Sequence, residues 1–110
     1  MLWHITTPTA WEKAQNGGEY RADSLQSEGF IHCSTTAQIA ATANRFYAGQ
    51  TGLIALAIDE NKVKASIRYE DFNAGDLFPH IYGPLNLDAV TVAIDYEPGS
   101  DGKFRTPIVD

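Results

Sequence analysis

The spacing of apolar and polar positions predicts two helices in the first half of the chain. Residues 2–6 (LWHIT) suit a short strand, and Thr7-Pro8 after them supply an N-cap and a proline at the first helical position. We expect this helix to end at Gly17-Gly18, where glycine can form a left-handed cap. A second helix, capped by Ser34 or Thr35 and reaching about Ala48, is predicted from an apolar stripe of Ile39, Ala43, Phe46 and Tyr47.

Strand patterns dominate the second half of the chain. Residues 53–59 (LIALAID) are almost continuously apolar, as expected of a central strand that is covered on both faces. Two weaker strand candidates, 67–70 and 78–82, are joined by a loop through Gly75. The tail from Pro98 is loop-like, with a short edge segment at 107–109. The full set of strand candidates is 2–6, 30–34, 53–59, 67–70, 78–82 and 89–96.

The order of these elements predicts the fold class. Residues 20–28 are polar and irregular, with a turn at Asp23 and Ser24. Helices come early and strands come late, which favours an α+β fold over a doubly wound parallel sheet. With 110 residues, the chain should form one domain over residues 1–110.

The charge balance restricts the partners. The chain has 14 acidic and 8 basic residues, and its net charge is −6. Proteins that wrap nucleic acid carry clustered Lys and Arg, so the sequence argues against nucleic acid but allows one small phosphate-bearing ligand. The longest apolar run, residues 53–58, is far shorter than the ~20 residues that span a bilayer. A single cysteine and no signal-peptide pattern predict a cytoplasmic protein, and the oligomeric state stays open.

All three histidines share one local pattern, in which a hydroxyl residue follows two positions later. Residues i and i+2 of a strand point to the same face, so each strand would present an imidazole and a hydroxyl together. We therefore predict one cleft for a small-molecule ligand, lined by convergent polar groups. The pairs are His4 and Thr6, His32 and Ser34, and His80 and Tyr82, with Ile5, Cys33 and Ile81 on the opposite, buried face.

Other interpretations of these residues stay open. The histidines can be structural, in which case the domain is a non-catalytic ligand sensor or interaction module. Three imidazoles can also bind zinc, although no short ligand spacing and no evident acidic second-shell partner support this. A nucleophilic pair of Cys33 with a histidine is a further alternative, but alternation turns Cys33 away from His32. Arg21, in the polar segment before the second histidine, is a candidate contact for an anionic group of the ligand.

Long stretches of the chain resemble a bacterial family catalogued as domain of unknown function 952. The matching motifs are HITTPTAW at 4–11, GEYRADSLQSEGFIHCST at 18–35, ANRFYAGQ at 43–50 and FPHIYGPLNLDAV at 78–90. The family carries no established reaction. It has been grouped with the ADP-ribosyltransferase-like superfamily, and this implies a split, mainly antiparallel sheet with two early helices and a cleft for a nicotinamide nucleotide.

The resemblance also suggests roles for the predicted site residues. In the superfamily, a His-x-Thr motif on the first strand approaches the nicotinamide ribose, and His4 and Thr6 match it. His32 and Ser34 match the second position. The third position is commonly a glutamate, but here the late strand offers His80 or Tyr82. Because a carboxylate stabilises a cationic ribosyl centre better than an imidazole does, this departure weakens the expectation of standard ribosyl transfer.

Together these observations predict a domain that binds a nucleotide-like small molecule, with NAD as the ligand or cofactor that the resemblance implies. As a transferase, it would use His32 or His80 to donate or accept a proton, while His4 and Thr6 orient a ribose and Tyr82 stacks on the base. The predicted catalytic residues are His4, His32 and His80, and the predicted ligand contacts are Thr6, Ser34, Tyr82 and Arg21.

Overall fold

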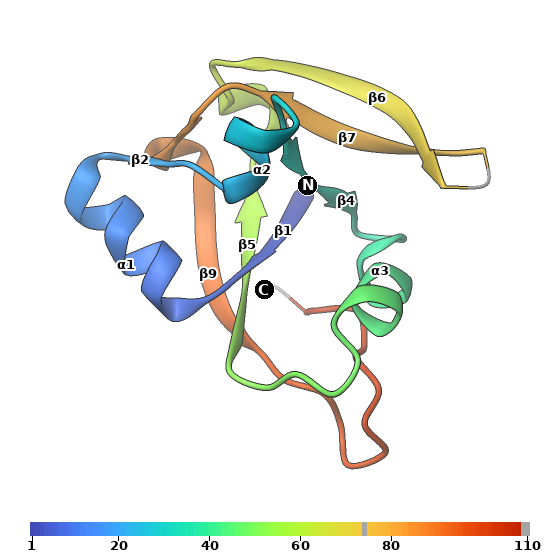
Figure 1. Cartoon of the computed structure of the whole chain (residues 1–110). Coiled ribbons are helices and arrows are strands. Elements are labelled where there is room, and N and C mark those ends of the chain that lie inside the picture. The colour runs from blue at the N-terminus through green and yellow to red at the C-terminus, as the bar shows by residue number, and fades with distance from the viewer. Residues whose placement is uncertain (74, 109–110) are drawn as a thin grey trace.

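Two larger blocks of antiparallel strands meet at residues 31–35, where the chain passes from one block to the other (Figure 1). The computed structural model describes residues 1–73 and 75–108, and within them it has three antiparallel sheets and three α-helices. The α+β class predicted from the order of elements is therefore confirmed. The described residues contain no helix that is both long and apolar enough to cross a membrane.

The four-stranded sheet has the order β4-β1-β5-β9. Its strands are β4 (Ser34–Thr35), β1 (Leu2–Thr6), β5 (Leu53–Ile58) and β9 (Val90–Tyr96). As its unbroken apolar run predicted, β5 lies between two strands and is almost entirely buried.

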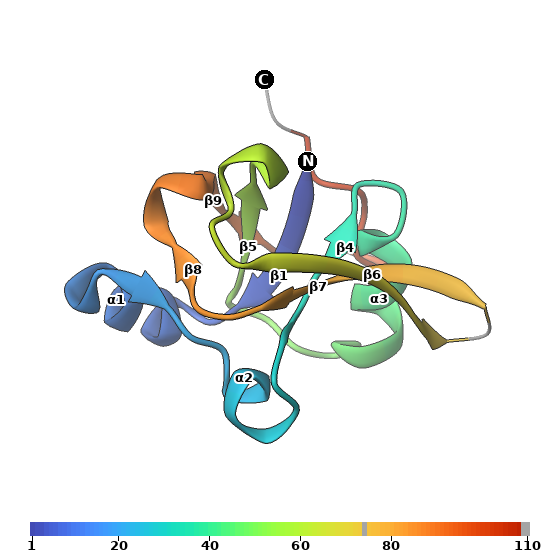
Figure 2. The same cartoon turned by 90° about the horizontal axis from the view of Figure 1, so that it is seen from above.

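The side chains of this sheet alternate between two apolar cores. Leu56 and Ile58 of β5 belong to one core, while Ala55 and Ala57 belong to the other. Helix α1 (Pro8–Gly17) packs Ala14 into the first core, and α3 (Ile39–Phe46) packs its buried residues into the second. The two helices accordingly lie on opposite sides of the sheet (Figures 1 and 2).

A second sheet, of order β3-β7-β6, carries the remaining two histidines. It consists of β3 (Ile31–His32), β7 (Asp76–Tyr82) and β6 (Ser66–Asn73), and its register places His32 directly opposite His80. The hairpin of β6 and β7 crosses above β1 and β5 (Figure 2). A two-stranded sheet of β2 (Glu19–Tyr20) and β8 (Leu85–Asn86) lies beside α1, and single 3-10 turns cover 60–62 and 87–89.

The first helix has the predicted ends. The Thr7 hydroxyl accepts a hydrogen bond from the backbone N–H of Ala10, with Pro8 in the first turn, and Gly18 closes the helix at φ +89°. Because these signals act within a few residues, local sequence was sufficient to place both ends.

Other boundaries differ from the prediction. The segment 20–28 is not irregular, because it contains the end of β2 and helix α2 (Asp23–Ser27). The predicted strand 30–34 is interrupted at Cys33, whose N–H bonds to the Pro79 carbonyl, so that β3 and β4 join different sheets. Helix α3 starts only at Ile39, because the Gln38 side chain accepts from the Thr35 N–H and holds a turn there.

The carboxyl-terminal tail is loop-like, as expected, but it contributes to the core. Phe104 is 1% exposed and its ring packs against Tyr96. Pro107 and Ile108 form no strand, and the rest of the predicted edge segment lies outside the described residues, as does part of the loop that contains Gly75.

Candidate functional site

A cavity of about 790 Å3 is bordered by β1, the segment around α2, the end of β3 with β4, helix α3 and the start of β7. This volume lies in the range of about 300–1,000 Å3 that small-molecule sites occupy. Six of the seven predicted site residues line the cavity, namely His4, Thr6, Arg21, His32, Ser34 and His80. The structure therefore brings the three imidazoles to one hollow, and the roles suggested for them remain predictions.

His4 is buried and held at both ring nitrogens. Its Nδ1 lies 2.6 Å from the carbonyl oxygen of His32, and its Nε2 lies 2.7 Å from the hydroxyl of Tyr20. That hydroxyl is also 2.9 Å from Oγ1 of Thr6. The three side chains form a buried polar chain in an otherwise apolar part of the domain.

Burial determines the protonation state of this chain. Desolvation lowers the pKa of His4 to about 4, and it raises the pKa of Tyr20 to about 12, so both groups are neutral at pH 7. A carbonyl oxygen can only accept, so Nδ1 of His4 carries the proton and Nε2 accepts from the Tyr20 hydroxyl. The Thr6 hydroxyl must then donate to the Tyr20 oxygen, which leaves the lone pairs of Thr6 as acceptors.

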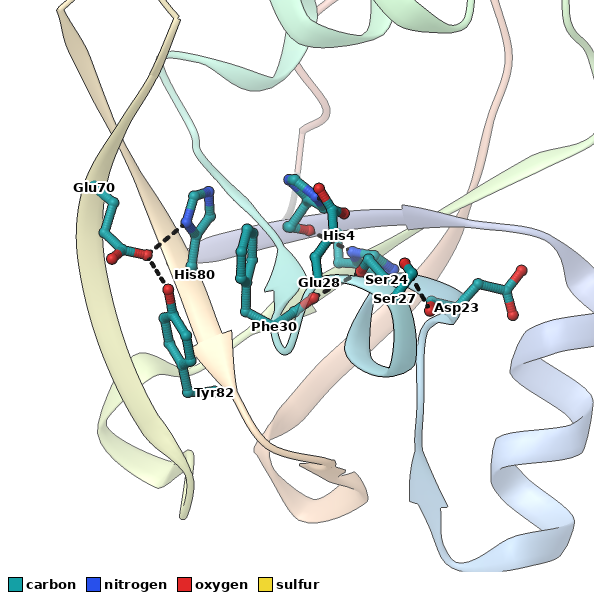
Figure 3. A network of polar contacts seen from close by, with 10 residues as sticks. His4, Asp23, Ser24, Ser27, Glu28, Phe30, Glu70, His80 and Tyr82 are labelled. Atoms are coloured by element: carbon teal, nitrogen blue, oxygen red, sulfur yellow. Dashed lines mark hydrogen bonds and ion pairs between the residues drawn. The ribbon is translucent and has the colours of Figure 1, made fainter.

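The other two histidines are each bonded to a glutamate. Nε2 of His32 donates to the Glu28 carboxylate at 2.7 Å. Nδ1 of His80 donates to the Glu70 carboxylate at 2.9 Å (Figure 3). No acidic partner for the histidines was evident from the sequence, but the structure supplies one for each of these two. Sequence could not show the second pair, because Glu70 reaches His80 only across the β6–β7 hairpin, whereas Glu28 lies just four residues before His32.

His32 and His80 differ in their access to solvent. The His32 side chain is 32% exposed, whereas that of His80 is 4% exposed. The two rings meet edge to face with centroids 5.3 Å apart, and Phe30 stacks on His80 at 4.1 Å. His32 is thus the most accessible of the three imidazoles, and His80 supports the wall of the cavity.

Tyr82 is the predicted contact that does not line the cavity. Its hydroxyl donates to the Glu70 carboxylate at 2.5 Å, and its ring contacts Phe30 (Figure 3). The Arg68 guanidinium lies 4.6 Å from the centroid of the Tyr82 ring. The hydrogen bond from Tyr82 is the largest cause of a lowered Glu70 pKa. Its hydroxyl thus supports the carboxylate that holds His80.

The remaining predicted residues occupy the rim and one wall. Ser34 is buried, and its hydroxyl lies 3.3 Å from that of Thr42 on α3. The exposed Arg21 forms an ion pair with Glu19 at 2.6 Å, so its guanidinium is already bonded to a carboxylate.

Side chains around the cavity follow the expected alternation between the two faces of a strand only in part. Ile81 is fully buried away from it, whereas Ile5 and Cys33 border it contrary to expectation. Cys33 stands between β3 and β4, where strand geometry is interrupted. Burial raises the pKa of its thiol, so Cys33 remains a thiol at neutral pH and is a poor nucleophile. In the described part of the chain, no three His, Cys, Asp or Glu side chains are grouped to hold a metal ion.

Several lining residues were not proposed as site residues from the sequence. Tyr20 carries no local signal of its link to His4, because the two are joined only through the tertiary fold. Arg45 and Phe46 of α3 also line the cavity. Phe46 was assigned to the buried stripe of its helix, but it is 49% exposed, and only Ile39 and Ala43 of that stripe are fully buried.

Comparison with solved structures finds similarity to one bacterial protein, which has been solved both by crystallography and by NMR. The crystal structure of protein CC0527 from Caulobacter crescentus has a TM-score of 0.85 and 28% identity, covering 94% of this chain and 92% of that one. The solution NMR structure of CC0527 has a TM-score of 0.80 and 29% identity, covering 93% and 89%. A comparison with curated proteins found none that matches. The family model "Protein of unknown function (DUF952)" matches residues 5–93, and the chain therefore belongs to that family.

Proposed function

We propose that the cavity binds a nucleotide-like small molecule, and that NAD or a related nucleotide is its ligand. One observation carries this proposal. Imidazole and hydroxyl groups from β1, from the β3–β4 segment and from β7 converge on one cavity of about 790 Å3. Convergent polar groups in a cavity of this size are the usual form of a small-molecule site. The ADP-ribosyltransferase-like resemblance supplies the ligand class, and it enters here only as an analogy.

Thr6 is suited to contact a ribose. Because its hydroxyl donates to Tyr20, its lone pairs are placed to accept a hydrogen bond from a ribose hydroxyl. His4 has both nitrogens engaged by the His32 carbonyl and by Tyr20. It therefore acts through Tyr20 and Thr6 as a positioning residue, rather than by bonding to the ligand itself.

His32 is the group proposed to exchange a proton with the ligand. It is the most exposed of the three imidazoles, it lines the cavity, and the Glu28 carboxylate fixes its ring at 2.7 Å. A carboxylate bonded to one imidazole nitrogen orients the ring and fixes its tautomer. Among the described residues, no glutamate lines the cavity, and the carboxylates on its border are those of Asp23 and Asp76. Because the glutamate of ordinary ribosyl transfer has no counterpart among these lining residues, the proposal is binding with proton exchange rather than ribosyl transfer.

The test is a titration of NAD into isotopically labelled protein, followed at the three imidazole rings by NMR. We expect shifts at His32 first, and about tenfold weaker binding in His32→Ala. Gln26→Ala is the control, because Gln26 is exposed on α2 and does not border the cavity. Unchanged signals at all three rings at saturating NAD would reject the proposal.

A second candidate function is a non-catalytic sensor or interaction module whose histidines stabilise the fold. The burial of His4 and His80, which are 8% and 3% exposed, favours it for these two residues. The discriminating measurement compares stability with binding in His80→Ala. A large loss of unfolding free energy with unchanged NAD affinity would assign His80 to the fold, whereas the reverse would assign it to the ligand.

A further inference from the structure

The last turn of α3 presents an aromatic ring where a buried residue would be expected. Ile39 and Ala43, earlier on the same helix stripe, are both fully buried. Phe46 continues that stripe but is 49% exposed, and it lines the cavity together with the half-buried Phe78 of β7. A half-exposed aromatic ring that lines a cavity offers its face for stacking on a planar ligand ring.

An arginine accompanies this ring. The Arg45 guanidinium lies 5.3 Å from the centroid of Phe46, and it also lines the cavity. Among the described residues it forms no ion pair, although the chain has 14 acidic and only 8 basic residues. Asp23 and Asp76 border the same cavity, and neither is paired with Arg45. The helix C-terminus favours a cation at this position, so the guanidinium is retained there at little cost.

We propose that Arg45 and Phe46 form the subsite for the phosphate and the base of a phosphorylated nucleoside. Phe46 stacks on the planar base, and Arg45 pairs with a phosphate, as guanidinium groups do with two parallel hydrogen bonds. The ribose then lies against the part of the cavity that is lined by His4, His32 and His80. This inference rests on the proposed function and adds to it the ligand class and two residues that determine specificity.

The experiment measures the affinity of three probes by calorimetry. NAD has base and phosphate, ribose 5-phosphate lacks the base, and adenosine lacks the phosphate. We expect Phe46→Leu to weaken NAD about tenfold and to leave ribose 5-phosphate unchanged. Arg45→Gln should weaken NAD and ribose 5-phosphate about tenfold each, and it should leave adenosine unchanged.

Two matched controls separate these effects from a general loss of charge or aromatic surface. Arg68→Gln removes a guanidinium that also lies over an aromatic ring, and Tyr69→Leu removes an aromatic ring that is 44% exposed. Neither residue lines the cavity, so both variants should bind NAD like the wild type. Phe46→Trp, which keeps a stacking surface, should retain NAD binding. In the wild-type protein, the Phe46 ring signals should shift with NAD and adenosine but not with ribose 5-phosphate.

The outcomes distinguish this inference from the proposed function. Wild-type affinity for NAD in both Phe46→Leu and Arg45→Gln would overturn the subsite and leave the histidine-lined site standing. Unmoved Phe46 signals at saturating NAD in the wild-type protein would overturn the subsite without any substitution. The test therefore remains valid even if one of the variants fails to fold. If wild-type protein binds none of the probes, the proposed function and the subsite fall together.

Discussion

Acidification should destabilise this domain through one buried ring, that of His4. The folded-state pKa of His4 is about 4, whereas the unfolded chain has the ordinary value of 6.5. Between these two pH values the unfolded state binds a proton that the folded state does not. Stability therefore rises with pH in this window and falls as the pH is lowered from about 6.5 to 4.

The size of the effect follows from the displacement of the pKa. At 1.36 kcal/mol for each pKa unit, a change from 6.5 to about 4 corresponds to a loss of about 3 kcal/mol. This is a large part of the total stability of about 5–15 kcal/mol that is typical of proteins. Hydrogen bonds from Tyr82 and Asn86 lower the pKa of Glu70 and Asp88, and these carboxyls add a loss in the same direction at lower pH.

The assay is urea unfolding at pH 7, 6, 5 and 4, for the wild type and for His4→Gln. The wild type should lose about 3 kcal/mol more than the variant between pH 7 and pH 4. The variant is less stable at pH 7, so the comparison is made between the two pH slopes. Direct titration of the His4 ring by NMR provides an independent measure. Equal slopes for the two proteins, or a His4 ring that titrates above pH 6, would refute the reasoning.

Three further predictions concern folding, each measured by urea unfolding at pH 7. Tyr20→Phe removes the hydroxyl that links the buried histidine and threonine of β1, and should cost about 2 kcal/mol; an unchanged midpoint contradicts that link. Asn44→Ala removes both hydrogen bonds to the Phe104 backbone, and should cost about 2 kcal/mol and expose the tail to proteolysis. Gly83→Ala adds a Cβ 2.9 Å from that of Ala65 on a backbone with φ +151°, so a loss of about 2 kcal/mol is expected, and wild-type stability would disprove the strain.

Local sequence was sufficient wherever a structural signal is complete within a few residues. The first helix has the predicted cap, proline and glycine at its ends, because each acts on backbone groups one to four residues away. The unbroken apolar run at 53–58 identified the central strand, since only a strand covered on both faces needs such a run. The α+β class followed from the order of these elements.

The candidate site was predicted in part. The i and i+2 pattern identified five residues that line one cavity, because pairs such as His4 and Thr6 share a strand face. It failed for Tyr82, which lies on the hairpin beside Glu70 and not on the cavity. The pattern specifies which residues share a face of a strand, but it does not specify which residues or which cavity that face contacts.

The contacts of the histidines depend on the folded chain and could not be read from local sequence. His4 bonds to a carbonyl 28 residues away in the sequence, and Glu70 reaches His80 through the register of a hairpin. The exposure of Phe46 likewise depends on whether another element covers the end of α3. These contacts depend on strand register and packing over the whole chain, whereas caps and apolar runs depend on near neighbours. Local sequence was therefore enough to identify the main elements and the candidate imidazoles, whereas the folded arrangement sets their partners and their exposure to a ligand.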